Sequence, residues 1–214
     1  MTRWEGWYKK KGFRIEPEMP HVYRLVGRVR PRVLDLGCGH GRHVIYFARK
    51  GCAVYGIDNY YKAIVGLKRD LGRLGLSANL LVRDFRRKLP YPNGYFDIVV
   101  ATRSVHHADS KTVYRIGREI SRVMKSRGIL FLQVPEYKEQ GSAKRSRNRY
   151  GKDMGHRWIE PHTYVPLSGL EKSVPHLSFD EEELRGFLRG YRILGLHKET
   201  GHYHGYCAIA RKVS

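Results

Sequence analysis

The sequence predicts an α/β domain built on a mostly parallel sheet, and two patterns indicate this fold. The apolar run Val33–Leu36 is followed by glycines at positions 37, 39 and 41, which is typical of a strand that turns tightly into a helix. A second apolar run, Ala53–Ile57, ends in Asp58 about 20 residues further on. Because an acid at this position of a βαβ unit can accept both hydroxyls of a ribose, the first half of the chain predicts a nucleoside-cofactor site.

Apolar periodicity and turn residues predict the remaining elements. Ser178 and Glu181 have the spacing of a capping box for the last helix. The pair His106-His107 is expected to begin the helix that follows the fourth strand, and residues 136–178 show no clear strand or helix period. The expected strands are 32–37, 53–58, 79–84, 95–101, 128–134, 191–197 and 203–211, and the expected helices are 18–29, 41–50, 60–74, 110–125 and 179–189.

The glycine pattern discriminates between cofactors. In the dinucleotide fingerprint G-x-G-x-x-G, read from Gly37, the last glycine would fall on Arg42, where close packing of helix and strand needs a small residue. The observed pattern is D-x-G-x-G-x-G, from Asp35 to Gly41. A carboxylate at Asp35 suits a cationic ligand and repels a pyrophosphate, so a nicotinamide enzyme is the weaker alternative.

This pattern resembles motif I of the class I S-adenosylmethionine (SAM) dependent methyltransferases. Further segments in the family's order extend the resemblance over about residues 30–135, although Ser126 and Arg127 replace the usual Pro-Gly before the fifth strand. The resemblance implies a Rossmann-like fold with a seven-stranded, mostly parallel sheet, a reversed last strand and helices on both faces. The matching segments are Leu80–Phe85, Phe96–Ala101, Arg103–His107 and Arg127–Val134, and a later stretch from Thr163 to Leu184 is similar to uncharacterised archaeal and bacterial methyltransferases.

The resemblance also implies which residues bind SAM. Asp35 would face the cationic end of the cofactor, Asp58 the ribose, and Asp84 the adenine amino group. Phe85 would contact the adenine, and Thr102 would lie under the methionine part. The expected cofactor-binding residues are Asp35, Gly37, Gly39, Gly41, Asp58, Asn59, Asp84, Phe85 and Thr102, and no metal ligand is predicted.

The catalytic residues are harder to predict, because methyl transfer from a sulfonium mainly requires alignment and exclusion of water. A base is needed only where the acceptor must lose a proton early. Aromatic rings could stack a planar acceptor and a histidine could take its proton. The candidates for catalysis are Tyr8, His106, Tyr164 and His176, and Trp7 and His162 are further candidates for the acceptor pocket.

The charge balance indicates a polyanionic partner. The chain has 41 Lys and Arg against 20 Asp and Glu, a formal net charge of +21. Ion-pair networks of a heat-adapted protein need both signs, so adaptation to heat does not by itself explain this excess. Two groups of basic residues are either solvated surface or phosphate-binding ridges. One is the stretch 144–149, and the other consists of five residues along the helix at 110–125. Those five residues are Lys111, Arg115, Arg118, Arg122 and Lys125.

Several functions therefore stay open at this point. An RNA methyltransferase, acting on tRNA or rRNA, competes with a small-molecule or protein methyltransferase and with a SAM-binding protein that has no activity. The strand-four tip Thr102-Arg-Ser lacks the Pro-Pro motif of many exocyclic amino methyltransferases. Scattered cysteines and the lack of a long apolar run favour a cytoplasmic protein without a membrane span. We expect one domain, 1–214, with an N-terminal aromatic and basic cap at about 1–29 and an insertion at about 136–178 over the active site.

Overall fold

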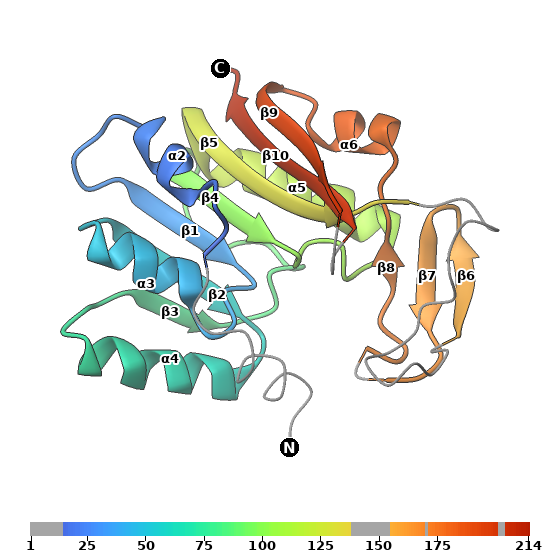
Figure 1. Cartoon of the computed structure of the whole chain (residues 1–214), viewed down its shortest axis with the longest axis horizontal. Helices are drawn as coiled ribbons and strands as arrows, with labels where there is room; N and C mark the ends of the chain where they lie inside the picture. The colour runs from blue at the N-terminus through green and yellow to red at the C-terminus, as the bar shows by residue number, and fades with distance from the viewer. Residues whose placement is uncertain (1–14, 138–154, 170, 201–203) are drawn as a thin grey trace.

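A seven-stranded sheet with strand order β3-β2-β1-β4-β5-β10-β9 forms the centre of the computed structural model, which describes residues 15–137, 155–169, 171–200 and 204–214 (Figure 1). Strand β10 runs antiparallel to both of its neighbours, while the other pairs are parallel. The expected fold, a mostly parallel sheet with a reversed last strand, is confirmed. The strands are β1 (Arg32–Leu36), β2 (Ala53–Asp58), β3 (Asn79–Val82), β4 (Phe96–Thr102), β5 (Met124–Pro135), β9 (Tyr191–Glu199) and β10 (Gly205–Lys212).

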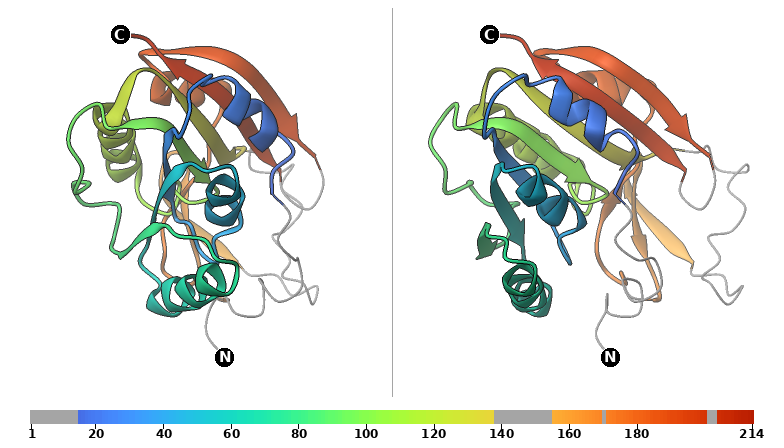
Figure 2. Two further views of the ribbon diagram at one scale, coloured as in Figure 1. Left: turned by 90° about the vertical axis from the view of Figure 1, so that its left-hand side faces the viewer. Right: turned by 60° about the vertical axis from the view of Figure 1, so that its left-hand side comes forward.

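Helices cover both faces of this sheet (Figure 2). One face is covered by α2 (Met19–Arg24), α3 (Arg42–Arg49) and α4 (Tyr61–Arg73), and the other by α5 (Ser110–Val123) and α6 (Glu181–Phe187). Successive residues of the central strands therefore enter two separate apolar cores, which is why these strands read as continuous apolar runs. Within the described part of the chain, no helix is both long enough and apolar enough to span a bilayer.

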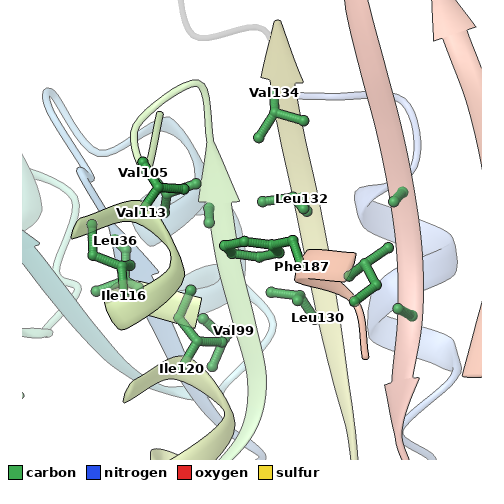
Figure 3. Close-up of a cluster of buried hydrophobic side chains, with 14 of the residues drawn as sticks. Leu36, Val99, Val105, Val113, Ile116, Ile120, Leu130, Leu132, Val134 and Phe187 are labelled. Atoms are coloured by element: carbon green, nitrogen blue, oxygen red, sulfur yellow. The ribbon is translucent and has the colours of Figure 1, made fainter. Parts of the chain in front are cut away.

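Helix α5 shows how spacing builds one of these cores. Val113, Ile116 and Ile120 recur at intervals of three and four residues, so they form one buried stripe. Figure 3 shows this stripe packed toward Val99 of β4 and Leu130 of β5. This packing fixes α5 against the sheet and thereby fixes the loop between β4 and α5.

The two histidines before α5 do not begin the helix, so this expectation was wrong. Helix α5 starts at Ser110, because the Asp109 side chain accepts a hydrogen bond of 2.8 Å from the amide of Thr112. His106 and His107 instead lie in the turn between β4 and α5. The cap leaves both imidazoles in the loop at the carboxyl end of β4.

The capping box of the last helix lies two residues later than expected. The Asp180 carboxylate accepts from the Glu183 amide at 2.8 Å, and the Glu183 carboxylate accepts from the Asp180 amide at 3.1 Å. Ser178 is unavailable for this role because its amide bonds to the His162 carbonyl and the chain is still extended there. Helix α6 therefore begins at Glu181.

Residues 155–177 contain a small antiparallel sheet that the sequence did not predict. It consists of β6 (His156–Glu160), β7 (Thr163–Pro166) and β8 (His176–Leu177). These strands are short, and the register shifts between Trp158 and Glu160, so no clear alternation marks them in the sequence. Figure 1 shows the small sheet beyond the carboxyl end of β4. The Leu177 amide joins it to the β4–α5 loop by a 2.9 Å hydrogen bond to the His106 carbonyl.

Candidate functional site

The site lies where the connections of two neighbouring strands diverge. Strands β1 and β4 are adjacent and parallel, but β1 continues into α3 on one face of the sheet and β4 into α5 on the other. In open α/β sheets, ligands bind at the carboxyl ends of the strands on either side of such a switch point. The glycine turn follows β1, and Thr102 ends β4, so both predicted elements meet at this point.

The glycine turn is held so closely that side chains are excluded from it. Gly37 and Gly41 have φ values of +74° and +80°, a region that residues with a Cβ rarely adopt. A Cβ on Gly37 would lie 2.5 Å from the Cβ of Ser104, and one on Gly41 would lie 2.2 Å from Leu67. Ser104 also donates a 2.6 Å hydrogen bond to the Leu36 carbonyl, which fastens the turn to the loop after β4.

Asp58 at the end of β2 completes this turn. One carboxylate oxygen accepts the amide of Gly39 and the other accepts the amide of Tyr60, both at 2.8 Å. Each carboxylate oxygen has a second lone pair, so Asp58 can still accept ribose hydroxyls. Asn59 follows it with an exposed side chain. The ribose-binding role of Asp58 stays a prediction that this geometry fits, and the cofactor-binding role of Asn59 stays a prediction.

Asp35 is a buried acid with an unused oxygen. It is 2% exposed, and burial raises its pKa to about 7, an effect that Arg42 opposes and Asp58 reinforces. Its Oδ2 finds no hydrogen-bond partner among the described residues. His43 lies 3.9 Å away, but burial lowers its pKa well below the usual range, so the neutral imidazole does not neutralise Asp35. A cationic or hydrogen-bond-donating ligand group would satisfy this oxygen, whereas a phosphate would not.

Asp84, the acid predicted to bind the adenine amino group, already pairs with Arg86. Strand β3 ends at Val82, and Asp84 lies in the following loop. The Arg86 guanidinium bonds both Asp84 oxygens, at 2.9 Å and 2.8 Å, and lowers the pKa of Asp84. An adenine amino group would have to share the carboxylate with Arg86. The Phe85 ring lies 3.6 Å from the position of a Cβ on Gly37, so it is placed beside the turn as expected.

The tip of β4 contains a buried hydroxyl and a strained residue. Thr102 Oγ1 is buried and has no hydrogen-bond partner in the described ranges, so its predicted role in cofactor binding stays a prediction that this geometry fits. Arg103, which no sequence pattern marked as a site residue, has a φ of +53°. Such strain in a residue other than glycine clusters at functional sites. Glycine would have marked this conformation in the sequence, but arginine gives no such signal.

An ion-pair network that the sequence did not reveal surrounds Arg103. Its guanidinium lies 3.3 Å from Glu199 of β9 and 3.8 Å from Glu16, which itself pairs with Arg42 at 2.7 Å. Gln133 of β5 donates to the same Glu199 at 2.7 Å. These residues are far apart in the chain, and only the fold brings them to the carboxyl ends of β1 and β4.

Three of the four catalytic candidates gather in one cluster. The ring centroids of His106 and His107 are 4.0 Å apart, and those of His107 and His176 are 4.8 Å apart. Tyr164 stacks on His176 with centroids 5.2 Å apart. Ser104 links this cluster to the glycine turn, because its carbonyl lies 3.1 Å from His107 Nδ1. The fourth candidate, Tyr8, and the acceptor-pocket candidate Trp7 lie outside the described residues.

The protonation states limit what this cluster can do. Burial, together with His107 and His176, lowers the pKa of His106 well below its ordinary value, so its imidazole is neutral. Burial raises the pKa of Tyr164 to about 12, so its phenol is not a base near neutral pH. His162 lies apart from the cluster, stacked on Tyr137 at 3.8 Å and 2.8 Å from a Glu183 oxygen.

Comparison with known proteins agrees with this geometry. Residues 34–132 match the family model of a methyltransferase domain. An uncharacterized methyltransferase of Synechocystis is 31% identical over 47% of this chain and 45% of its own length. Ribosomal RNA small subunit methyltransferase C of Alcanivorax borkumensis is 29% identical over 47% of this chain and 31% of its own length. The chain thus spans less than half the length of these two relatives.

A solved structure extends the likeness over the whole chain. It is 1,6-didemethyltoxoflavin-N1-methyltransferase of Burkholderia thailandensis, which has S-adenosylhomocysteine bound. Its TM-score is 0.72 at 19% identity, over 98% of this chain and 82% of that one, a likeness that shows the shared fold. The strand order and this likeness show that the chain has the fold of SAM-dependent methyltransferases, and residues 34–132 match the methyltransferase-domain family model.

Proposed function

We propose that this protein transfers a methyl group from SAM to an acceptor and that the acceptor is RNA. The observation that carries the first part is the glycine turn bonded to Asp58, next to the unsatisfied oxygen of Asp35. When bound, SAM supplies an electrophilic methyl group on a sulfonium. The leaving group would be a neutral thioether, S-adenosylhomocysteine, so the protein has mainly to align the acceptor and to exclude water.

The residues at the switch point fit each part of this cofactor. The open oxygen of Asp35 suits the ammonium group of the amino-acid end, and Asp58 suits the ribose hydroxyls. The ring of Phe85 offers an apolar surface for the adenine, and Thr102 Oγ1 can bond the methionine part. A dinucleotide fits less well, because the uncompensated carboxyl oxygen of Asp35 would repel its pyrophosphate.

The excess of positive charge supports the RNA acceptor. A net charge of +21 attracts polyanions and speeds their encounter with the protein. Lys111, Arg115 and Arg118 are exposed on α5 and are available to phosphates. We also propose that residues 136–178 form an insertion that covers the active site and that residues 1–29 form a cap, within one domain. The cytoplasm is the expected location.

A small-molecule acceptor is the second candidate, and the histidine cluster favours it. The rings of Tyr164, His106 and His176 pack together at the loop after β4, and such rings can stack on one planar metabolite. The neutral His106 imidazole could accept a proton from such an acceptor, although burial makes it a weak base. The relatives are named for activities on different acceptors, so their names do not choose between the two candidates.

Calorimetry with SAM and S-adenosylhomocysteine tests the cofactor proposal. We expect both to bind the purified protein and an NAD control not to bind. Binding of NAD without binding of either SAM compound would overturn the assignment. If SAM binds but no cell fraction accepts a tritiated methyl group from it, the protein is a SAM-binding protein without activity.

Tritiated SAM tests the acceptor. The protein is incubated with separate RNA, protein and small-molecule fractions of the source organism, and we expect label in the RNA fraction. RNA affinity should fall about ten-fold or more between roughly 50 and 200 mM salt, because several phosphate contacts release counterions. Label confined to small molecules, with RNA binding that does not depend on salt, would replace RNA by the second candidate.

A further inference from the structure

Three imidazoles from two distant segments converge beside the site. His106 and His107 come from the β4–α5 loop, and His176 comes from β8. One ring nitrogen from each lies within 4.8 Å of the other two. In a tetrahedral zinc site, nitrogen ligands are about 3.3 Å apart, because each bond is about 2.0–2.1 Å long. Small side-chain rotations would therefore bring the three nitrogens to bonding distance from one ion.

The hydrogen bonds of two of these rings select the same neutral tautomer. His107 Nδ1 lies 3.1 Å from the Ser104 carbonyl, and His176 Nδ1 lies 2.9 Å from the Val174 carbonyl. Carbonyls only accept hydrogen bonds, so both Nδ1 atoms carry the proton. In the neutral tautomer, each Nε2 then holds a lone pair. A backbone carbonyl that accepts the other ring N–H is the usual means of orienting a metal-binding histidine.

Glu171 places a negative charge beside two of these imidazoles. Its carboxylate lies 3.0 Å from His176 Nε2 and 3.5 Å from His107 Nε2. A carboxylate oxygen and an imidazole lone pair are both acceptors, so a proton or a metal ion has to lie between them. The third ring has a buried nitrogen that a metal ion could satisfy. His106 is 5% exposed, and its Nδ1 has no hydrogen-bond partner among the described residues.

We propose that His106, His107 and His176 bind one divalent transition-metal ion of the zinc class, with Glu171 as the neighbouring acid that balances its charge. Imidazole ligands suit zinc, copper, iron and nickel, whereas magnesium and calcium prefer oxygen ligands. The ion would connect β8 to the β4–α5 loop, which the Leu177–His106 backbone hydrogen bond already joins. This inference does not depend on the ligand at the glycine turn, but an ion on His106 would occupy the lone pair that the small-molecule candidate needs for a proton.

Titration of the metal-free protein with Zn²⁺ and Co²⁺ tests this proposal. After dialysis against a chelator, we expect one equivalent of either ion to bind and Co²⁺ to give the intense visible absorption of four-coordinate sites. His107→Gln and Glu171→Gln are the test variants, since both residues are partly exposed and tolerate substitution better than the buried His176. His107→Gln should weaken Zn²⁺ binding at least about ten-fold, the smallest loss expected even for a residue that only orients a metal ligand.

A matched control separates this cluster from another one. Glu18, His197 and Cys207 also lie within 4.8 Å of one another, so His197→Ala removes a histidine from that group and leaves the proposed site intact. We expect His197→Ala to bind Zn²⁺ and Co²⁺ like the unmodified protein. Far-UV circular dichroism confirms that each variant is folded. A cobalt spectrum that persists in folded His107→Gln, that disappears in His197→Ala, or that never forms in the unmodified protein would overturn the proposal.

Discussion

The amide of Gly39 donates a 2.8 Å hydrogen bond to the carboxylate of Asp58, which is 19 residues away in the sequence. Gly39 lies in the turn after β1, and Asp58 ends β2. The acid therefore has a structural role before any ligand binds, because it fixes the backbone against which the ligand would lie. Under the proposed function, this acid would link the shape of the turn to the affinity for SAM.

Asp58→Ala should weaken SAM binding by about 10- to 100-fold. It removes the acceptor for Gly39 and the proposed acceptor for the ribose, and hydrogen bonds to a charged group contribute about 1.5–3 kcal/mol. Calorimetry with S-adenosylhomocysteine measures the loss. Lys68→Ala in α4 is the control, since the Lys68 side chain is exposed and does not belong to the predicted cofactor residues. Equal affinities of Asp58→Ala and the unmodified protein would remove Asp58 from the cofactor site.

SAM affinity should rise with pH because of Asp35. Burial raises the pKa of Asp35 to about 7, so the group is protonated below that pH and ionised above it. Ionised Asp35 attracts the cationic cofactor, so affinity should increase from about pH 6 to about pH 8 with release of a proton. Calorimetry in buffers of different ionisation enthalpy measures this release. Asp35→Asn cannot ionise and should lack the rise; the same pH profile in both proteins would contradict this role.

The same pKa shift predicts how the stability of the unliganded protein depends on pH. With a pKa raised to about 7, Asp35 binds its proton more tightly in the folded chain than in the unfolded chain, where an aspartate has a pKa of about 3.9. The folded state therefore loses stability as pH rises from about 4 to about 7. Asp35→Asn removes this buried charge. Near pH 8 its free energy of unfolding should exceed that of the unmodified protein, and near pH 4 the two values should differ less. Urea unfolding at both pH values measures the difference, and a larger advantage at pH 4 would show that the sign is wrong.

Local patterns made the sheet predictable. The strand Ala53–Asp58 has the bounds that its apolar run predicts, and Arg32–Leu36 differs by one residue. Both strands are buried on two faces and end at glycine or acid. The apolar run therefore predicts the burial of each strand, and the residue next to it predicts where the strand ends. The link between the glycine turn and Asp58 was predictable for the same reason, because both belong to one βαβ unit.

Features that depend on tertiary contact were not predictable. The histidine cluster requires His176 to lie against His107, 69 positions earlier, and the short strands β6–β8 that place it there carry no regular alternation. The pair of Arg86 and Asp84 was not predictable either, although the two residues are close in the sequence. Its hydrogen bonds depend on the orientation of the two side chains, which the sequence spacing does not determine. The strained backbone of Arg103 is likewise imposed by its surroundings.

Gly41→Ala should destabilise the protein by at least about 2 kcal/mol. Its φ is +80°, which costs a residue with a Cβ about 1–2 kcal/mol, and the new methyl group would meet the fully buried Leu67. Gly66→Ala in α4 is the matched control, because nothing lies within 4 Å of its Cβ and alanine favours a helix by about 1 kcal/mol. Urea unfolding measures both variants. A neutral Gly41→Ala would show that the turn tolerates side chains.

The basic residues of α5 should divide into two functional groups. Arg122 donates to the carbonyls of Tyr91 and Leu89 at 2.8 Å and 3.0 Å, and it pairs with Glu119 at 2.8 Å. It therefore anchors the loop before β4, and Arg122→Ala should cost about 1–3 kcal/mol in urea unfolding. Arg118 is exposed, and Arg118→Ala should change stability by less than about 0.5 kcal/mol.

The same two variants should differ in the opposite way in RNA affinity, with the loss in Arg118→Ala and not in Arg122→Ala. If phosphates bind along α5, Arg118→Ala should lower RNA affinity equally for different sequences and reduce the salt slope by about one, because one counterion fewer is released. Arg122 already directs its guanidinium to the protein, so folded Arg122→Ala should bind RNA like the unmodified protein. Filter binding across a salt series measures both. An Arg118→Ala protein with unchanged affinity and slope would show that this helix face is solvated surface and that RNA, if bound, lies elsewhere.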